Sequence, residues 1–198
     1  MDYHYPAGTV RDLLATDAVT DATRQALTER LEQQPRQPTF FSADEFKLLT
    51  CITNRLLPQD DSVGRIDIAG AIDERLTNNK SDGWRYDSMP NDREAYQLGL
   101  KATDESAVAL YGAPFCDLPV EQQDEVLNAV QAGTPPGVTW QQVPAGRFFE
   151  ETFAEVVNAY YSHPLGQEEI GYVGMADVPT WQQLKLNELE TREPRPID

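Results

Sequence analysis

The chain has 198 residues, 40% of them hydrophobic and 25% charged, and its 33 acidic against 16 basic residues give a formal net charge of −17. This length suits one domain with a substantial core, whereas the acidic balance excludes nucleic acid and anionic membrane surfaces as expected partners, because both would repel the chain. Only four basic residues are lysines, a bias that suits either a halophilic source or a high-GC genome. No stretch approaches the 18 or so apolar residues that span a bilayer, so no direct membrane insertion is expected.

Residues 1–38 are expected to form an N-terminal arm with short helices. Thr20 or Asp21 is placed to cap a helix that runs to about Gln33, and the proline-rich run that follows has the composition of a linker. The N-terminus has neither the basic and apolar segments of a secretory signal nor a paired-arginine motif. The sequence therefore predicts a cytoplasmic location, with the periplasm as the alternative.

Clear helix signals begin at residue 42. Ser42 followed by Glu45 is a capping box, and the apolar residues after it predict a helix to Pro58. Asp67 is a natural cap for a second helix that ends near Asn78. After a loop over residues 78–92, Asp92 is placed to cap a third helix.

A fourth helix is expected to start at Pro119, and the glycine- and proline-rich run at residues 133–137 stops it. No run alternates at period two with β-branched residues, so no strand is predicted. The expected fold is all-α, a single compact domain of about six to seven helices with long structured loops. Its expected parts are the arm at 1–38, a helical domain at 39–185 and a C-terminal tail at 186–198.

The two cysteines leave two interpretations open. Cys51 lies within the apolar rhythm of a helix and Cys116 lies in a loop, so both can be buried free thiols or can pair as a disulfide. A zinc site needs about four ligands, and two cysteines with two distant histidines supply no such cluster. No metal site is predicted.

The most informative stretch is residues 148–181. Apolar residues recur at helical spacing and form one stripe, which consists of Phe149, Phe153, Val156 and Tyr160. A second set of positions widens this stripe, namely Phe148, Thr152 and Val157. Pro164 is expected to end this helix. The run that follows contains Gly166, Gly171 and Gly174 and is interpreted as a loop held by the core or by a partner.

No catalytic or cofactor-binding arrangement is found. The spacings GxGxxG and GxxxxGK are absent, so no residue is predicted to bind a flavin or nucleotide. The acidic pairs Glu150–Glu151 and Glu168–Glu169 are interpreted as solvated faces or partner contacts. His163 has two interpretations: its ring caps the C-terminal carbonyls of the helix before Pro164, or it anchors a loop that meets a partner.

The run YYSHPLGQEEIGYVG, preceded by a phenylalanine-rich helix and followed by a tryptophan, resembles the C-terminal signature of the gluconate 2-dehydrogenase subunit 3 family. The resemblance extends back through LLTCITNRLLPQ, IDIAGAIDERL and the segment from Tyr96 to Val130, and so covers roughly residues 40–185. Proteins of this family are small subunits of flavin-dependent sugar and sugar-acid dehydrogenases. Many carry a twin-arginine signal and escort their catalytic partner to the periplasm. The twin-arginine motif is not seen in this sequence.

The resemblance implies a non-catalytic small subunit that binds and stabilises a large subunit of the glucose-methanol-choline type. That partner would hold FAD, oxidise a sugar, polyol or sugar acid, and pass electrons to an acceptor such as a cytochrome c subunit. The alternative is a stand-alone helical binding or assembly protein with no redox partner. Because tyrosine and tryptophan are enriched at interfaces, we expect the partner to contact Tyr160, Tyr161, His163, Pro164, Tyr172 and Trp181.

Overall fold

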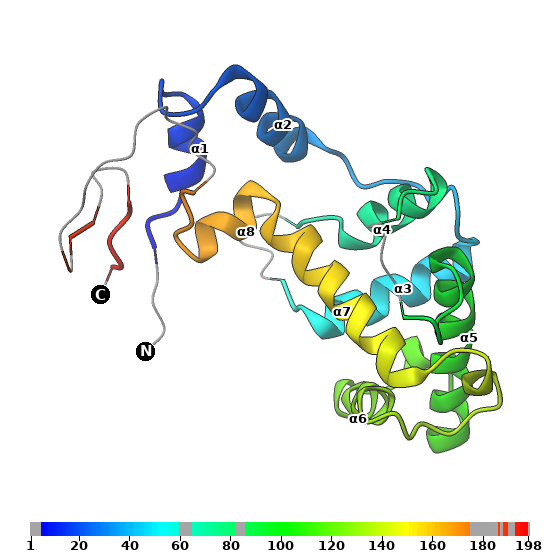
Figure 1. Cartoon of the computed structure of the whole chain (residues 1–198). Coiled ribbons are helices and arrows are strands. Elements are labelled where there is room, and N and C mark those ends of the chain that lie inside the picture. The colour runs from blue at the N-terminus through cyan, green and yellow to red at the C-terminus, as the bar shows by residue number, and fades with distance from the viewer. Residues whose placement is uncertain are drawn as a thin grey trace. The chain divides into compact units, whose positions relative to one another are not determined.

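The computed structural model describes residues 5–59, 65–81 and 86–174, together with residues 186, 188–189 and 193–197. Over these residues the chain forms eight α-helices and two short 3-10 helices, with no β-sheet (Figure 1). In order these are α1 (Thr9–Leu14), α2 (Asp21–Glu32), α3 (Ala43–Leu56), α4 (Ile68–Thr77), α5 (Asp92–Tyr111), η1 (Phe115–Asp117), α6 (Val120–Gln131), η2 (Thr139–Gln141), α7 (Ala145–Tyr161) and α8 (Pro164–Glu169). The predicted all-α class is confirmed.

The described residues divide into two compact units. The central unit takes its residues from 35–60 and 67–159, and the terminal unit from 1–34, 61–66 and 160–198. The boundary in the C-terminal half falls within α7, between Ala159 and Tyr160. The division at residues 38 and 185 expected from the sequence stays a prediction.

The capping signals read from the sequence start the helices as expected. Ser42 Oγ accepts from the Glu45 backbone N–H at 3.3 Å, while Glu45 Oε2 accepts from the Ser42 N–H at 2.9 Å. Asp67 Oδ1 accepts from the Gly70 N–H at 2.9 Å at the start of α4. At α5 the prediction was one residue off, because Asn91 is the cap and Asp92 is the first helical residue.

The helix α7 buries only part of the broad apolar stripe predicted for it. Its buried residues are Ala145, Phe148, Thr152 and Val156, so Val156 of the main stripe and two residues of the second set are confirmed, whereas Phe149 is only half-buried. Phe148 is buried because its ring lies where a Cβ on Gly99 of α5 would otherwise stand. Phe153, in contrast, is 42% exposed.

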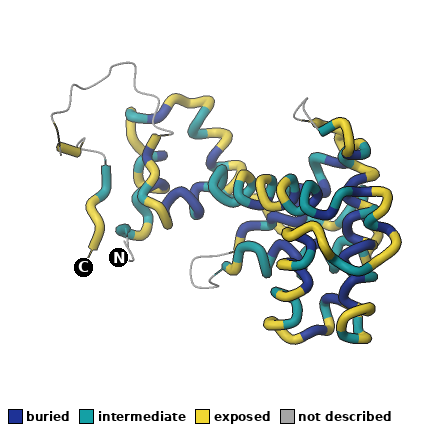
Figure 2. Tube along the Cα trace, turned by 60° about the horizontal axis from the view of Figure 1, so that its bottom comes forward, coloured by how far each residue is buried: buried dark blue, intermediate teal, exposed yellow. Residues whose placement is uncertain are grey.

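The core of the central unit lies between helices whose buried and exposed positions alternate with the helical period (Figure 2). Tyr96 joins two phenylalanines edge to face, with ring centroids 6.2 Å from Phe41 and 6.0 Å from Phe148. Edge-to-face aromatic pairs add to the free energy of area burial. The fully buried side chains of this unit include Leu49, Ile52, Ile72, Leu76, Leu100, Phe115, Val126 and Val130.

A buried carboxylate fixes the segment that precedes α3. Asp73 of α4 is 2% exposed. Its Oδ1 accepts from the backbone N–H groups of Phe40 and Phe41 at 3.0 and 2.9 Å, and its Oδ2 accepts from the Thr39 N–H and hydroxyl at 2.8 and 2.9 Å. Burial alone would raise the pKa of Asp73, but these hydrogen bonds to Phe41, Thr39 and Phe40 outweigh it and lower the pKa.

A disulfide joins Cys51 of α3 to Cys116 of η1, with Cα atoms 5.8 Å apart. The sequence left two interpretations open. The structure has the disulfide, so the interpretation as two free thiols is wrong. The bridge closes a chain segment with a sequence separation of 65 residues within the central unit.

The terminal unit has a smaller core and a charged clasp. Its buried apolar cluster is formed by Leu14, Val19 and Leu27, with Leu13, Ala18 and Leu31 packed against it. Glu168 of α8 is 4% exposed and accepts, all at 3.0 Å, from the backbone N–H groups of Gly8 and Arg11 and from Nε and Nη2 of Arg11. A carboxylate at this place stabilises the start of α1, where backbone N–H groups lack partners. The interpretation of Glu168 as solvated or partner-facing is wrong.

The segment after α7, which the sequence predicted to be a loop, begins with a short helix. Residues 164–169 form α8 rather than a loop, since Gly166 lacks a Cβ that would meet the Tyr160 carbonyl. Among the helices of the described residues, none is long and apolar enough to cross a bilayer.

Candidate functional site

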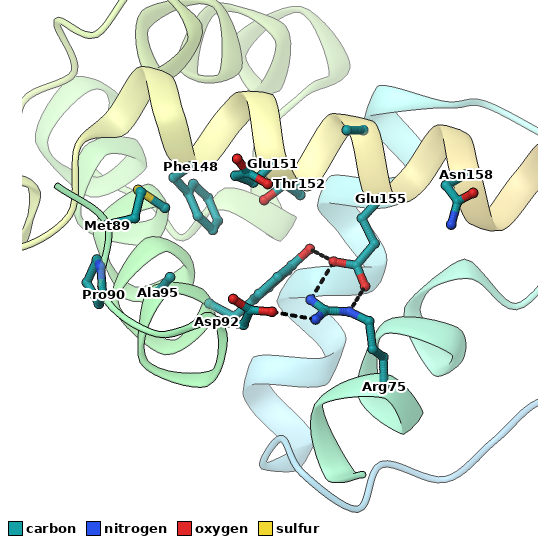
Figure 3. Close-up of a pocket in the computed structure, with 12 residues that line it drawn as sticks. Arg75, Met89, Pro90, Asp92, Ala95, Phe148, Glu151, Thr152, Glu155 and Asn158 are labelled. Atoms are coloured by element: carbon teal, nitrogen blue, oxygen red, sulfur yellow. Dashed lines mark hydrogen bonds and ion pairs between the residues drawn. The ribbon is translucent and has the colours of Figure 1, made fainter. Parts of the chain in front are cut away.

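A cavity of the central unit lies between α7, the end of α4, the start of α5 and the nearby residues Met89 and Pro90 (Figure 3). Its volume is about 280 Å³. Residues distant in the sequence meet here, with Arg75 coming from α4, Asp92 from α5 and Glu155 from α7. The lining residues are Arg75, Met89, Pro90, Asp92, Ala95, Tyr96, Phe148, Glu151, Thr152, Ala154, Glu155 and Asn158.

Arg75 is the centre of the polar side of this cavity. Its Nε and Nη2 donate to the two carboxylate oxygens of Glu155, the latter at 2.8 Å. Its Nη1 donates to Asp92 Oδ2 at 2.6 Å and to the Lys80 carbonyl at 2.8 Å. Burial would lower the pKa of Arg75, but the hydrogen bonds and charges of Glu155 and Asp92 raise it, so the guanidinium stays charged.

Tyr96 adds a further hydrogen bond to the network of Arg75, Asp92 and Glu155. Its hydroxyl donates to Glu155 Oε2 at 2.5 Å, and its side chain is 4% exposed. Burial, followed by the charge and hydrogen bond of Glu155, raises the pKa of Tyr96, while Arg75 and Thr152 act weakly in the opposite direction. The phenol therefore stays protonated and acts as a donor.

One polar atom of this lining has no partner. Thr152 is 2% exposed, and its Oγ1 makes no hydrogen bond. It influences the Tyr96 phenol, but not in hydrogen-bonding geometry. A buried hydroxyl left unsatisfied costs about 1–3 kcal/mol, so this cavity wall carries an unmet polar group.

A second surface lies on the other side of α7. The rings of Phe149 and Phe153 stack with centroids 6.0 Å apart and an interplanar angle of 14°. Hollows of about 660 and 430 Å³ flank this pair, one toward Trp140 and Pro144 and the other toward Leu56. We call Phe149 and Phe153 the phenylalanine ridge. The sequence placed both rings in the core, whereas in the structure Phe153 is exposed and Phe149 is half-buried.

The family model for gluconate 2-dehydrogenase subunit 3 matches residues 43–177. The chain belongs to this family. Its members are accessory subunits of gluconate 2-dehydrogenase-type enzymes, and the matched region contains the cavity, the phenylalanine ridge and most of the predicted partner surface. Among curated proteins and among solved structures, no match to the chain was found.

The structure brings part of the predicted partner surface of this family member together. Tyr160 and Tyr161 end α7 with ring centroids 5.1 Å apart, and the Tyr160 hydroxyl donates to Glu169 Oε2 at 2.7 Å. Burial, followed by this contact with Glu169, raises the pKa of Tyr160. Pro164 is buried as the first residue of α8, so it offers no surface to a partner, and Trp181 lies outside the described residues.

Tyr172 is the most exposed of the predicted residues that the structure describes, at 48%, and its neighbour Ile170 is 46% exposed. The two residues are close in sequence, and large exposed apolar side chains are candidates for contact with a partner. We call Ile170 and Tyr172 the terminal apolar pair. Sequence reasoning found Tyr172 but not Ile170.

The ring of His163 does not cap the C-terminus of α7, and its expected role as the anchor of a loop that meets a partner stays a prediction. Its Nδ1 accepts from the Leu165 N–H at 3.2 Å, which caps the start of α8, and its Nε2 lies 2.9 Å from the Arg30 carbonyl at the end of α2. The ring thus caps helix termini, but not the C-terminus of α7. Burial lowers the pKa of His163, which fits a neutral ring with the proton on Nε2.

No metal centre is formed within the part of the chain that the structure describes, where no group of three or more histidine, cysteine, aspartate and glutamate side chains is placed to hold an ion. The carboxylates of the cavity are instead taken up by Arg75. The candidate sites of this chain are therefore one polar cavity and two exposed apolar surfaces.

Proposed function

We propose that this chain is the non-catalytic small subunit of a flavin-dependent dehydrogenase and that it binds and stabilises the large subunit. The large subunit, of the glucose-methanol-choline type, holds FAD and oxidises a sugar, polyol or sugar acid. The observation that carries the proposal is the family match over residues 43–177, which spans α3 to α8. Electrons then pass from the flavin to an acceptor such as a cytochrome c subunit of the same complex.

Two exposed surfaces support partner binding. The terminal apolar pair lies on the predicted partner surface, and the phenylalanine ridge adds an aromatic side chain that is 42% exposed. Aromatic residues at the centre of an interface bury much area at low entropic cost and often dominate its binding energy. A partner that binds only the folded chain also stabilises it by mass action.

The proposal is tested by co-expressing the chain with a flavin-dependent dehydrogenase large subunit from the same organism and purifying through a tag on the small chain. We expect a complex whose absorbance shows flavin bands and a colourless small chain when it is purified alone. Flavin bands in the isolated small chain would contradict the division of labour, and a flavoprotein that never co-purifies would contradict the partnership.

The surface is tested by Tyr172→Ala and Phe153→Ala, which remove side chains of similar exposure from the terminal apolar pair and the phenylalanine ridge. Loss of an interface anchor weakens binding by about 2 kcal/mol or more. We expect such a loss for Tyr172→Ala in the pull-down, with the melting temperature of the isolated chain little changed because the ring is half exposed. A large loss of stability with unchanged binding would place the interface elsewhere, and a loss confined to Phe153→Ala would move it to the phenylalanine ridge.

The cellular location remains a proposal. The Cys51–Cys116 disulfide favours the periplasm over the cytoplasm expected from the sequence, because disulfides persist mainly in oxidising compartments. We infer that the chain works in such a compartment. Thiol alkylation of the chain in intact cells tests this, since blocked thiols on both cysteines would return the chain to a reducing compartment.

The alternative function, a stand-alone binding protein, is favoured by one specific observation. The cavity of about 280 Å³ contains convergent polar groups beside an apolar wall, the usual make-up of a small-ligand site. A stable monomer that binds its own ligand and ignores the flavoprotein would support this alternative.

A further inference from the structure

The first two helices of the terminal unit lie outside the region that the family model matches. The family model begins at residue 43, whereas α1 and α2 end at Leu14 and Glu32. Both helices nevertheless pack against α8, which lies inside the matched region. We call residues 5–32 the strap. The strap is thus a segment outside the family match that covers a surface of the matched region.

The strap is tied near both of its ends to α8 and to the two residues before it. Near its start, Arg11 donates to the buried carboxylate of Glu168 through its backbone N–H and its guanidinium. Near its end, the Arg30 guanidinium donates to the Ser162 carbonyl, and the Arg30 carbonyl lies 2.9 Å from His163 Nε2. The net free energy of such contacts is modest, since water replaces them when they open.

The apolar cluster of the strap lies within the strap itself. Of the four buried apolar side chains of the strap, Val10 alone lies outside this cluster, and the partly buried residues of the cluster also belong to the strap. The strap can therefore leave α8 with its cluster intact. Residues 33–38, which join the strap to the central unit, form neither helix nor strand, so no regular element has to break at this joint. Opening of the strap should therefore cost less free energy than unfolding of the central unit.

The strap lies on the surface that the proposed partner would contact. The ring of Tyr5 lies against Gly171, where a Cβ would stand 2.5 Å from the nearest ring carbon. Gly171 separates Ile170 from Tyr172, the two residues of the terminal apolar pair. His163, another predicted partner contact, is also held by the strap. The strap and a partner bound at this pair would therefore need the same space.

We propose that the strap is a displaceable cover, which lies on α8 in the isolated chain and leaves it when the large subunit binds. The identity of the partner rests on the proposed function, whereas the opening of the strap does not. Because the partner binds the open form, its apparent affinity is the intrinsic affinity reduced by the fraction of open chains. A weaker strap should therefore give a tighter complex.

The opening is measured on the isolated full chain by native-state hydrogen exchange. Arg11→Ala removes the two guanidinium hydrogen bonds to Glu168 and keeps the backbone N–H groups in place. We expect exchange over α1 and α8 to rise about three- to tenfold, as for the loss of hydrogen bonds from a partly exposed charged group. Exchange over α3 and α5 should stay the same. Unchanged exchange over α8 would overturn the proposal, and an equal rise over α5 would show that the strap does not open separately.

The competition is measured as the affinity of the chain for the large subunit. Arg11→Ala is expected to bind the large subunit about three- to tenfold more tightly than the wild-type chain. The gain should equal the rise in exchange over α8, because both are proportional to the fraction of open chains. Equal or weaker binding by Arg11→Ala would overturn the displacement, and weaker binding would make the strap part of the interface instead.

Arg24→Ala is the matched control. Arg24 also lies in the strap, but its guanidinium donates to the carbonyls of Thr16 and Val19, which belong to the strap as well. The variant removes the same charge and keeps the contacts with α8, so its affinity for the large subunit is expected to equal that of the wild-type chain. Equal gains for Arg24→Ala and Arg11→Ala would show that net charge sets the affinity, which would overturn the proposal.

Failure of the proposed function gives a different result from failure of the strap. A large subunit that binds neither the wild-type chain nor Arg11→Ala would contradict the proposed function, and the displacement with it. The opening of the strap is then decided by hydrogen exchange in the isolated chain alone. A complex with Arg11→Ala but not with the wild-type chain would support both proposals, with the strap as a complete block.

Discussion

The central and terminal units each contain one buried carboxylate that accepts four hydrogen bonds, yet the donors differ. In the central unit, Asp73 accepts from three backbone N–H groups and the Thr39 hydroxyl, all of them uncharged. In the terminal unit, two of the four donors to Glu168 belong to the Arg11 guanidinium, and that side chain is 44% exposed. We call the hydrogen-bonded group around Asp73 the neutral clasp, because all its donors are uncharged. We call the group around Glu168 the charged clasp, because it depends partly on an ion pair with Arg11 that reaches solvent.

The two units also differ in the other interactions that stabilise them, the covalent link and the buried apolar side chains. The central unit has a disulfide, an aromatic cluster and, among the described residues, eleven of the twelve largest fully buried side chains. The described part of the terminal unit has fewer buried apolar residues, namely Val10, Leu14, Val19, Leu27, Ile66 and Val173. A polar clasp should therefore carry a larger share of the stability in the terminal unit, since less apolar area supports it.

The largest expected effect comes from removing the disulfide, which tests how far the central unit is held by its covalent link. Opening the bridge of 65-residue separation in Cys51→Ala/Cys116→Ala should lower the free energy of unfolding by about 4 kcal/mol, from the entropy regained by the unfolded chain. Urea unfolding followed by far-ultraviolet circular dichroism of the helices measures this. Equal stability of the oxidised and reduced wild-type chain would contradict it.

The next effect concerns the neutral clasp. Asp73→Asn keeps the shape but turns one oxygen into an N–H donor that faces two other donors, so at least two hydrogen bonds are lost. We expect a loss of about 3 kcal/mol, since hydrogen bonds to a charged group are worth about 1.5–3 kcal/mol each. Hydrogen exchange at Phe40 and Phe41 should accelerate with it. Unchanged exchange there would show that the segment before α3 is held by packing alone.

The charged clasp should show a smaller but local effect. Glu168→Gln removes the charge that Arg11 and the N–H groups of α1 face, and we expect a loss of about 2 kcal/mol. Hydrogen exchange over α1 should rise while exchange over α5 stays the same. Glu169→Gln, an equal change at the next, exposed position, is the control. An equal rise in both variants would mean that α8 as a whole has loosened.

The sequence predicts local features of this fold well, because their causes lie within a few residues. The capping box of Ser42 and Glu45 and the cap at Asp67 were found where they were expected. The rotation of α7 was not predictable from periodicity, because Phe148 and Phe149 both fit an apolar stripe. What decides between them is the space that Gly99 leaves, in a helix about fifty residues away in the sequence.

The candidate cavity was missed for the same reason. Arg75 and Glu155 are 80 residues apart in sequence, and in a chain with 33 acidic residues neither stands out. The helix α8 was read as a loop because glycines usually signal turns, whereas Gly166 serves a close approach to the Tyr160 carbonyl. Pairings set by tertiary contacts leave no local pattern, and this limits prediction from one sequence.

The last prediction uses acid to separate the two clasps. The pKa of Glu168 is lowered because, although burial acts to raise it, the hydrogen bonds and charge of Arg11 and the Gly8 N–H outweigh burial. Since the folded pKa lies below the ordinary value of 4.5, the stabilisation is complete above pH 4.5 and is lost as the pH falls through the folded pKa. For Asp73 the same loss begins only below its ordinary value of 3.8.

The terminal unit should therefore loosen first when the pH falls from 7 toward 3. Protection factors from hydrogen exchange, corrected for the intrinsic effect of pH, are expected to drop over α1 before they drop at Phe40 and Phe41. Glu168→Gln should abolish the early step, because no proton is then taken up at that position on unfolding of the clasp. If the variant keeps the early step, another of the many carboxylates is responsible, and the ion pair with Arg11 is not what distinguishes the two units.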